Sequence, residues 1–232
     1  MIDRVKVLLC CAPLLIAIPV SAQIVGHDPA KSPYEDVEYN QELTFLGGWD
    51  KMRHDPAGAA PLSRPIIGIR YEWTLVGPLA FSSEIDGAFG HRNLIEPLKP
   101  KATRDIGIQN NGVYDVDLAL VMNLPGTKSW HHLVPQLRGG IALMDSRAKD
   151  DSSGFAFGTP FAFVYGAGVK LVPGGRIGLR ADITDRLFHL SYPDSYYRPA
   201  SDNTAVVDAT TPHEFWTHHT AFTIGLSYYF AR

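Results

Sequence analysis

The chain has 232 residues, a hydrophobic content of 45%, a charged content of 19% and a formal net charge of −3. This length suits one domain, and no apolar run of about 18 residues follows residue 22, which excludes a transmembrane helix in the mature chain. The balanced charge offers no basic patch for a nucleic-acid partner.

The first 22 residues predict a signal peptide. Arg4 and Lys6 supply its positive start, an apolar segment follows, and small residues up to Ala22 offer a cleavage site. Both cysteines, Cys10 and Cys11, lie within it. Cleavage would leave a mature chain without cysteine, which excludes disulfides, thiol catalysis and cysteine metal sites.

Residues 23–40 are polar, contain Pro29 and Pro33, and predict a mostly irregular N-terminal periplasmic extension. From residue 41 onward, apolar and polar side chains alternate with a period of two, the period of a β-strand. Eight such stretches follow, at about 41–51, 66–76, 79–90, 113–123, 130–144, 160–172, 176–188 and 216–230.

The connections between these stretches alternate between long and short. The short turns are Gly77-Pro78, Pro125-Gly126 and Pro173-Gly174-Gly175. The longer loops lie at about 52–65, 91–112, 145–159 and 189–215. This rhythm is typical of a barrel that crosses a bacterial outer membrane as hairpins, with short turns in the periplasm and long loops outside. It predicts an all-β protein over 41–230, an eight-stranded antiparallel up-and-down transmembrane β-barrel, located in the outer membrane after cleavage near Ala22.

One face of each predicted strand is apolar, and the other carries small residues and charges. A narrow closed lumen would require these charges to pair, so they predict a lumenal charge network with a structural role. A gated path for ions or solutes is the alternative interpretation. The network comprises Glu42, Arg70, Glu72, Glu84, Asp86, Asp115, Asp117, Arg138, Lys170, Arg180, Asp182 and Arg186.

The alternation alone does not say which face is outside, because a water-soluble lipocalin has its apolar face inside. The tryptophans favour a membrane. Trp49 and Trp216 fall at the long-loop ends of their strands, whereas Trp73 and Trp130 fall at the short-turn ends. Two tryptophans at each rim are typical of the aromatic girdles at the two membrane interfaces.

With these features the chain resembles the small eight-stranded outer-membrane barrels of the OmpA/OmpX type, over about 41–230. The resemblance implies contact with outer-membrane lipid and lipopolysaccharide. It also implies that the outer-membrane assembly machinery recognises the last strand, although Ala231 and Arg232 after the terminal aromatic depart from the family's pattern. The alternating apolar residues of that strand are Phe222, Ile224, Leu226, Tyr228 and Phe230.

His189 and Ser191 form a His-x-Ser pair near the start of the last loop. Here the chain is similar to the eight-stranded lipid A deacylases, which use such a pair with an acidic third partner. Tyr192 replaces the family's following Asn, and the sequence identifies no acid. The other histidine groups lie in loops or at rims, where they predict no metal site. These groups are His213, His218 and His219, and His131 and His132.

We therefore expect a non-enzymatic outer-membrane protein without cofactor or metal. Its role would be structural or one of surface interaction, through long extracellular loops whose ligand the sequence does not identify. The alternatives are an enzyme that modifies lipid A as a deacylase does, with His189 and Ser191 as its catalytic residues, a small-solute channel, and a soluble lipocalin-like binder.

Overall fold

The structure, a computed structural model, describes residues 32–146, 154–172 and 174–230. The predicted signal peptide, 1–22, and residues 23–31 of the predicted extension 23–40 lie outside these ranges. A short 3-10 helix covers Asp194–Tyr196. Within the described ranges, no helix has the length and apolar character needed to cross a membrane.

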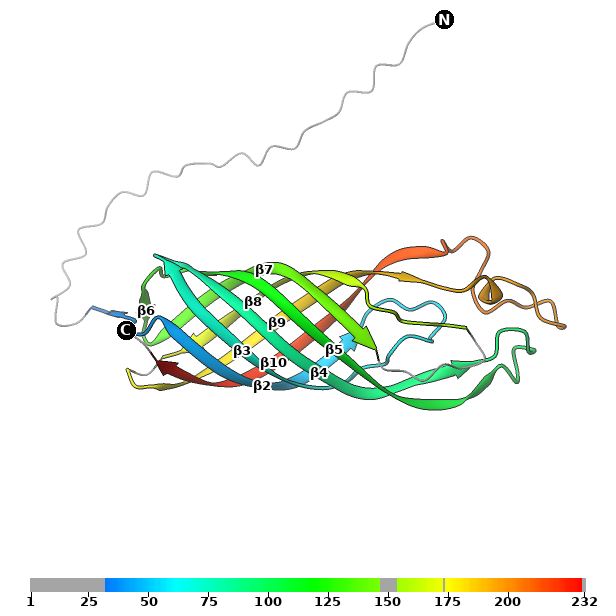
Figure 1. Ribbon diagram of the computed structural model, residues 1–232, viewed down its shortest axis with the longest axis horizontal. Coiled ribbons are helices and arrows are strands. Elements are labelled where there is room, and N and C mark those ends of the chain that lie inside the picture. Colours follow the sequence, from blue (N-terminus) through cyan, green and yellow to red (C-terminus); the bar gives the residue numbers. More distant parts are fainter. Residues whose placement is uncertain (1–31, 147–153, 173, 231–232) are drawn as a thin grey trace, which may run out of the picture. The chain divides into compact units, whose positions relative to one another are not determined.

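The described residues form ten strands (Figure 1). The eight that build the wall are β2 (Gln41–Met52), β3 (Arg64–Val76), β4 (Leu79–Ile95), β5 (Asp105–Asn123), β7 (Leu133–Ser146), β8 (Phe161–Leu171), β9 (Ile177–Ser191) and β10 (Glu214–Phe230). The two short ones are β1 (Tyr34–Asp36) and β6 (Lys128–Trp130).

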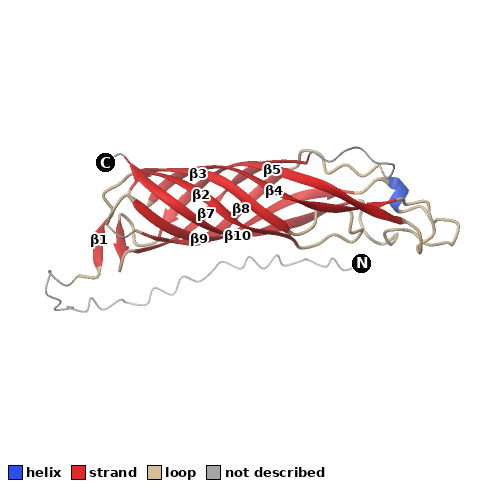
Figure 2. Cartoon of the chain, turned by 90° about the horizontal axis from the view of Figure 1, so that it is seen from below, coloured by secondary structure: helices blue, strands red, loops and turns tan. Residues whose placement is uncertain are grey.

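The eight wall strands close into a barrel. Each pairs antiparallel with the next wall strand along the chain, and β10 returns to pair with β2 from Phe230–Gln41 to His219–Met52. Both views show the strands strongly tilted around a narrow interior (Figures 1 and 2). The predicted eight-stranded antiparallel up-and-down barrel is confirmed.

The outward face of the wall is apolar and accessible. Ile67 and Ile85 are each 61% exposed and Ile224 is 69% exposed, whereas the inward Arg70 and Asp117 are almost fully buried. This polarity is the reverse of that in a water-soluble barrel, which packs its apolar side chains inside. A continuous apolar belt of this kind is stable against acyl chains and would aggregate in water.

All four tryptophans lie on the outer surface and are about half exposed, at 47% to 54%. Trp49 and Trp216 lie toward the long-loop ends of β2 and β10, and Trp73 lies toward the short-turn end of β3. Trp130 lies on β6, because the wall strand predicted at 130–144 begins only at Leu133. His131 and His132 between them have φ of +48° and +64° and reverse the chain in a two-residue hairpin turn.

The prediction of a loop over 91–112 is wrong for most of that range. β4 continues to Ile95 and β5 begins at Asp105, so the connection covers only 96–104. Polar side chains of β4 and β5 pair across this extended hairpin. For example, Arg92 Nε donates to Gln109 Oε1 at 3.0 Å. Beyond the membrane the outward positions need not be apolar, so the period-two signal fades although the strands continue.

Two other boundaries differ from their predictions. The last loop covers 192–213 instead of 189–215, because β9 and β10 pair up to Ser191 and Glu214. The predicted irregular extension contains β1, which pairs with β6 from Tyr34–Trp130 to Asp36–Lys128. Both strands are short and lack an alternating pattern, so local sequence gives no signal for them.

Adjacent glycines on β7 test the assignment of faces. A Cβ on Gly140 would collide with the backbone of Leu118 and Ala119, whereas a Cβ on Gly139 would meet no atom within 4 Å. We expect Gly140→Val to lower the free energy of unfolding in detergent by about 1–3 kcal/mol or more. Gly139→Val, on the lipid side, is the matched control and should change it little. Equal urea midpoints for the two variants would contradict the assignment.

Candidate functional site

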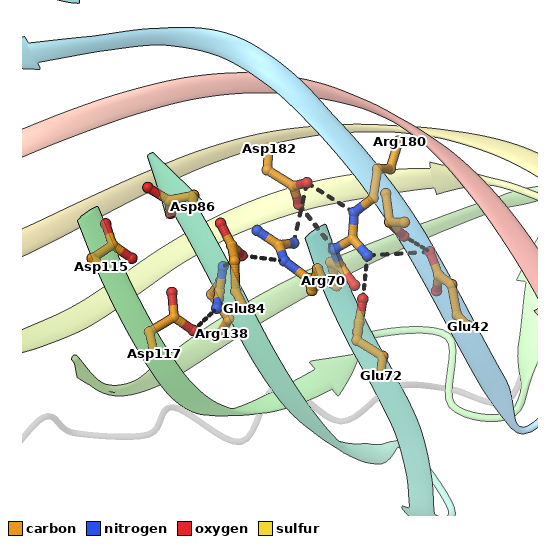
Figure 3. Close-up of polar contacts among 12 residues, drawn as sticks. Glu42, Arg70, Glu72, Glu84, Asp86, Asp115, Asp117, Arg138, Arg180 and Asp182 are labelled. Atoms are coloured by element: carbon orange, nitrogen blue, oxygen red, sulfur yellow. Dashed lines mark hydrogen bonds and ion pairs between the residues drawn. The ribbon is translucent and has the colours of Figure 1, made fainter. Parts of the chain in front are cut away.

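The polar faces meet inside the barrel as a column of charged side chains (Figure 3). Each of the twelve residues of the predicted charge network is at most 7% exposed. They come from seven of the eight wall strands, which the closed topology brings face to face. The column runs from the short-turn end toward the long-loop end of the barrel.

Two bases and two glutamates form the lowest cluster. Lys170 Nζ donates to Glu42 Oε2 at 2.7 Å and to Glu72 Oε1 at 3.1 Å. Arg180 Nη1 bridges the same two glutamates, at 3.2 Å from Glu42 Oε1. The Ser227 hydroxyl adds a hydrogen bond to Glu42 at 2.6 Å. Both carboxylates are therefore held by several donors, which offsets the cost of removing them from water.

Two arginines connect the middle of the column. Arg70 Nη1 lies 3.2 Å from Asp182 Oδ2, and Arg70 Nε also donates to Glu84. Arg138 binds Glu84 through Nη1 at 2.8 Å and Asp117 through Nη2 at 2.6 Å. Glu84 is therefore shared by two guanidinium groups, that of its register partner Arg70 on the adjacent strand β3 and that of Arg138 on β7.

The upper cluster contains residues that sequence reasoning missed. Arg186 pairs with Asp86 and, at 2.8 Å, with Asp115. The gap beside this cluster has no volume that could hold a water molecule. Above it, the Asp50 carboxylate lies 3.2 Å from both Arg64 Nη2 and His219 Nδ1.

The signal for the missed residues was present in the alternation. Asp50 lies an even number of positions from Glu42, and Arg64 from Arg70, so each is on the same face of its strand as that lumenal residue. The strand predicted over 66–76, however, begins after Arg64. The sequence groups His219 with loop histidines. It lies on β10, however, on the same face as the inward Thr223, and it is buried. Asp50 and His219 lie inside the predicted strands 41–51 and 216–230, so the alternation already places them on the lumenal face, whereas Arg64 is found only when its pattern is continued to the true start of the strand.

Apolar packing closes the outer end of the barrel. Loop residues such as Phe155, Phe157, Tyr196 and Val207 pack with inward wall residues such as Phe188 in one buried cluster. We call this cluster the outer cap. It includes Ala59, Ala60, Ile95, Val113, Ala142, Met144, Phe155, Phe157, Ala162, Val164, Phe188, Leu190, Tyr192, Tyr196 and Val207.

Polar contacts bind the loops of the outer cap to one another. Asp55 accepts the backbone N–H groups of Gly58 and Ala60 at 3.0 and 2.8 Å and the hydroxyl of Tyr192. Burial, together with the Asp55 charge, raises the pKa of Tyr192. The first outer loop is thus fastened to the last one, and Tyr192 remains a neutral donor.

The tip of the β4–β5 hairpin is fastened to the last loop as well. Arg104 Nη1 donates to the backbone oxygen of Ala205 at 2.6 Å, and the Lys101 N–H donates to Asp202 at 2.8 Å. The Thr204 hydroxyl and this N–H lower the pKa of Asp202 to about 2, so its carboxylate stays ionised well below neutral pH. The outer loops therefore form one connected surface.

At the short-turn end, the segment before β2 lies across the barrel mouth. Val37 and Tyr39 pack against Val134, Val172 and Tyr229, with the rings of Tyr39 and Tyr229 stacked at 6.2 Å. A pocket of about 120 Å³ between this segment and the wall reaches inward to Glu42, Glu72 and Lys170. The lowest charge cluster forms its inner end.

His189 and Ser191 lie on the outward face of β9 and are exposed. Their register partners on β10 are Trp216 and Glu214, and Glu214 Oε2 lies 3.9 Å from His189 Nε2. An acidic side chain, Glu214, therefore lies beside His189. Within the described part of the chain, no group of three His, Cys, Asp or Glu side chains has the arrangement of a metal site.

No family model and no curated protein sequence matches this chain. Solved structures do. The crystal structure of Neisserial surface protein A matches with a TM-score of 0.52 and 11% identity, over 82% of this chain and 97% of that one. The outer membrane protein OprG from Pseudomonas aeruginosa matches with a TM-score of 0.52 and 12% identity, over 84% and 98%. At this identity the likeness concerns the fold, and it confirms the predicted resemblance to small outer-membrane barrels at that level.

Removing one shared carboxylate tests the charge column. Glu84→Gln removes the carboxylate that Arg70 and Arg138 share and leaves each buried guanidinium with one charged partner, Asp182 or Asp117, so we expect the free energy of unfolding to fall by about 3–5 kcal/mol. The control is Glu96→Gln, which breaks an exposed pair with Lys99 and should change it by less than about 1 kcal/mol. Urea unfolding in lipid vesicles measures both, and equal losses would contradict the assigned role of Glu84.

Proposed function

We propose that this outer-membrane barrel is non-enzymatic and has a structural and surface-interaction role at the outer face of the membrane. The observation that carries the proposal is the outer cap, in which loops from different hairpins pack together and are fastened by Asp55, Arg104 and Lys101. A surface arranged before binding loses little conformational entropy when a partner docks. The loops at 53–63, 96–104 and 192–213 are where we expect that partner.

The interior supports this role over that of a channel. The paired charges fill the middle of the lumen, the outer cap covers its upper end, and the segment with Val37 and Tyr39 lies across its lower end. An ion path would have to separate ion pairs whose members are each desolvated, which is costly. We therefore assign the charge network to packing of the barrel.

The location in the outer membrane implies two kinds of partner, the lipids of that membrane and the machinery that assembles barrels in it. The apolar belt faces outer-membrane lipid, and the outer rim faces lipopolysaccharide. The final strand β10 presents Phe222, Ile224, Leu226 and Tyr228 outward, about half or more exposed, in the alternating form that the assembly machinery would recognise.

Fractionation and conductance test the proposal together. We expect the expressed chain in the outer-membrane fraction, with a band on a gel that shifts on heating, because barrels of this kind stay folded in cold detergent. In planar bilayers the purified protein should give no steady conductance. A soluble periplasmic product would reject the membrane role, and reproducible single-channel steps would favour a channel.

A second candidate function rests on one specific observation. His189, Ser191 and Glu214 lie together on the outward face near the outer rim, where an ester of a membrane lipid could reach them. A hydrolase needs a base that activates the Ser191 hydroxyl and an acid that orients that base. Glu214 Oε2 lies 3.9 Å from Nε2 of His189, so Nδ1 is the nitrogen that would have to reach the Ser191 hydroxyl.

Lipid analysis separates the two functions. Under the structural proposal, lipid A acylation is the same in cells that express the wild type, His189→Ala or Ser191→Ala. Ser83→Ala, which removes a serine elsewhere on the outward wall, is the matched control. Loss of an acyl chain that depends on His189 and Ser191, but not on Ser83, would establish the hydrolase and overturn the non-enzymatic role.

A further inference from the structure

A polar cluster interrupts the apolar outer wall at β9 and β10. Asp185 occupies an outward position of β9, yet its side chain is only 12% exposed. Its carboxylate accepts hydrogen bonds from Tyr165 Oη at 2.5 Å and Thr220 Oγ1 at 2.6 Å, and it lies 2.9 Å from Nδ1 of His218. A carboxylate on the lipid side is costly, so its full set of partners indicates a specific arrangement.

This cluster holds basic groups at the lipid side. Nδ1 of His218 is fixed by Asp185, and its Nε2 has no protein partner among the described residues. Arg53 Nε donates to Thr220 at 3.1 Å, while its two terminal nitrogens make no hydrogen bond or ion pair with a described residue. Lys51 is in register with Thr220 and is exposed on the same face. Several N–H donors therefore point outward without a partner.

The cluster borders a groove of about 720 Å³ in the outer wall. Leu137, Ala167 and Ile183 line its apolar part, which lies toward the short turns. β9 rises from Ile177 at its turn to Ser191 at the outer loop, so Asp185 lies above Ile183. The groove is therefore polar at the membrane surface and apolar below it, like a membrane lipid.

We propose that this lateral groove binds one phosphorylated lipid of the outer leaflet, of the lipid A class. Arg53 and Lys51 would hold the phosphate, with His218 as a further donor, and an acyl chain would lie along Leu137 and Ile183. Charge complementarity supports this occupant, because an arginine fork matches a phosphate and Asp185, the carboxylate among the described residues that line the groove, already has three partners. The inference rests on the proposed outer-membrane placement and names the lipid partner more closely.

Native mass spectrometry of the full chain in detergent micelles tests this assignment. The probes are bis-phosphorylated lipid A and the same lipid with its phosphates removed. We expect one phosphorylated lipid to bind about tenfold tighter or more than the dephosphorylated one. The double variant K51Q/R53Q should lose this preference. K128Q/R176Q, which removes two exposed bases at the opposite rim, is the matched control and should keep it.

Two further measurements sharpen the outcome. Asp185→Asn leaves both outer bases in place but weakens the hold on His218, so as a positioning variant it should bind the phosphorylated lipid several-fold less tightly. Millimolar inorganic phosphate should not displace the lipid, because it cannot fill the apolar part of the groove.

Equal wild-type affinity for the two lipids, or an unchanged preference in K51Q/R53Q, would overturn the proposal. Displacement by inorganic phosphate would show a simple anion site and would also overturn it. All variants are first checked for the band that shifts on heating. A wild-type chain without that band would instead overturn the outer-membrane placement, so the two failures are distinguishable.

Discussion

The structure depends on the pairing of charges inside a narrow barrel. Eight tilted strands enclose too little space for water to solvate the inward side chains, so each buried carboxylate must find its donors on other strands. Glu84, which two arginines share, and Arg180, which reaches two glutamates, show how this requirement is met. Because some partners come from strands far apart in sequence, such as Lys170 and Glu42, the complete network forms only when the barrel closes in one register.

The charged interior and the apolar exterior are two results of one alternation. Each wall strand sends every second side chain to the lumen, which leaves the intervening apolar side chains facing lipid. The outer end differs inside, because the outer cap packs apolar side chains where the lumen below it packs charges. The change marks where the surroundings of the barrel turn from acyl chains to water, and it separates a transmembrane part from an ordered surface part.

Departures from the alternation have a different origin in each place. Gly140 is small because the neighbouring strand passes very close to it. Asp185 is polar where the pattern calls for an apolar side chain, and its partners Tyr165, His218 and Thr220 come from the neighbouring strands β8 and β10. A polar residue that the fold supports at a costly position is more informative about binding than the regular residues around it.

The sequence by itself determined the number of wall strands, their faces and the short turns, because a period of two and turn residues such as Gly77-Pro78 are local signals. It also placed twelve charges on the lumenal face. The tertiary structure alone decided which charges pair, for example that Arg64 and His219 share the Asp50 carboxylate. It likewise decided the outer cap, the β1–β6 pair and the lateral groove. These features join residues more than a hundred positions apart in places, and such contacts depend on barrel closure, which leaves no periodic trace in the local sequence.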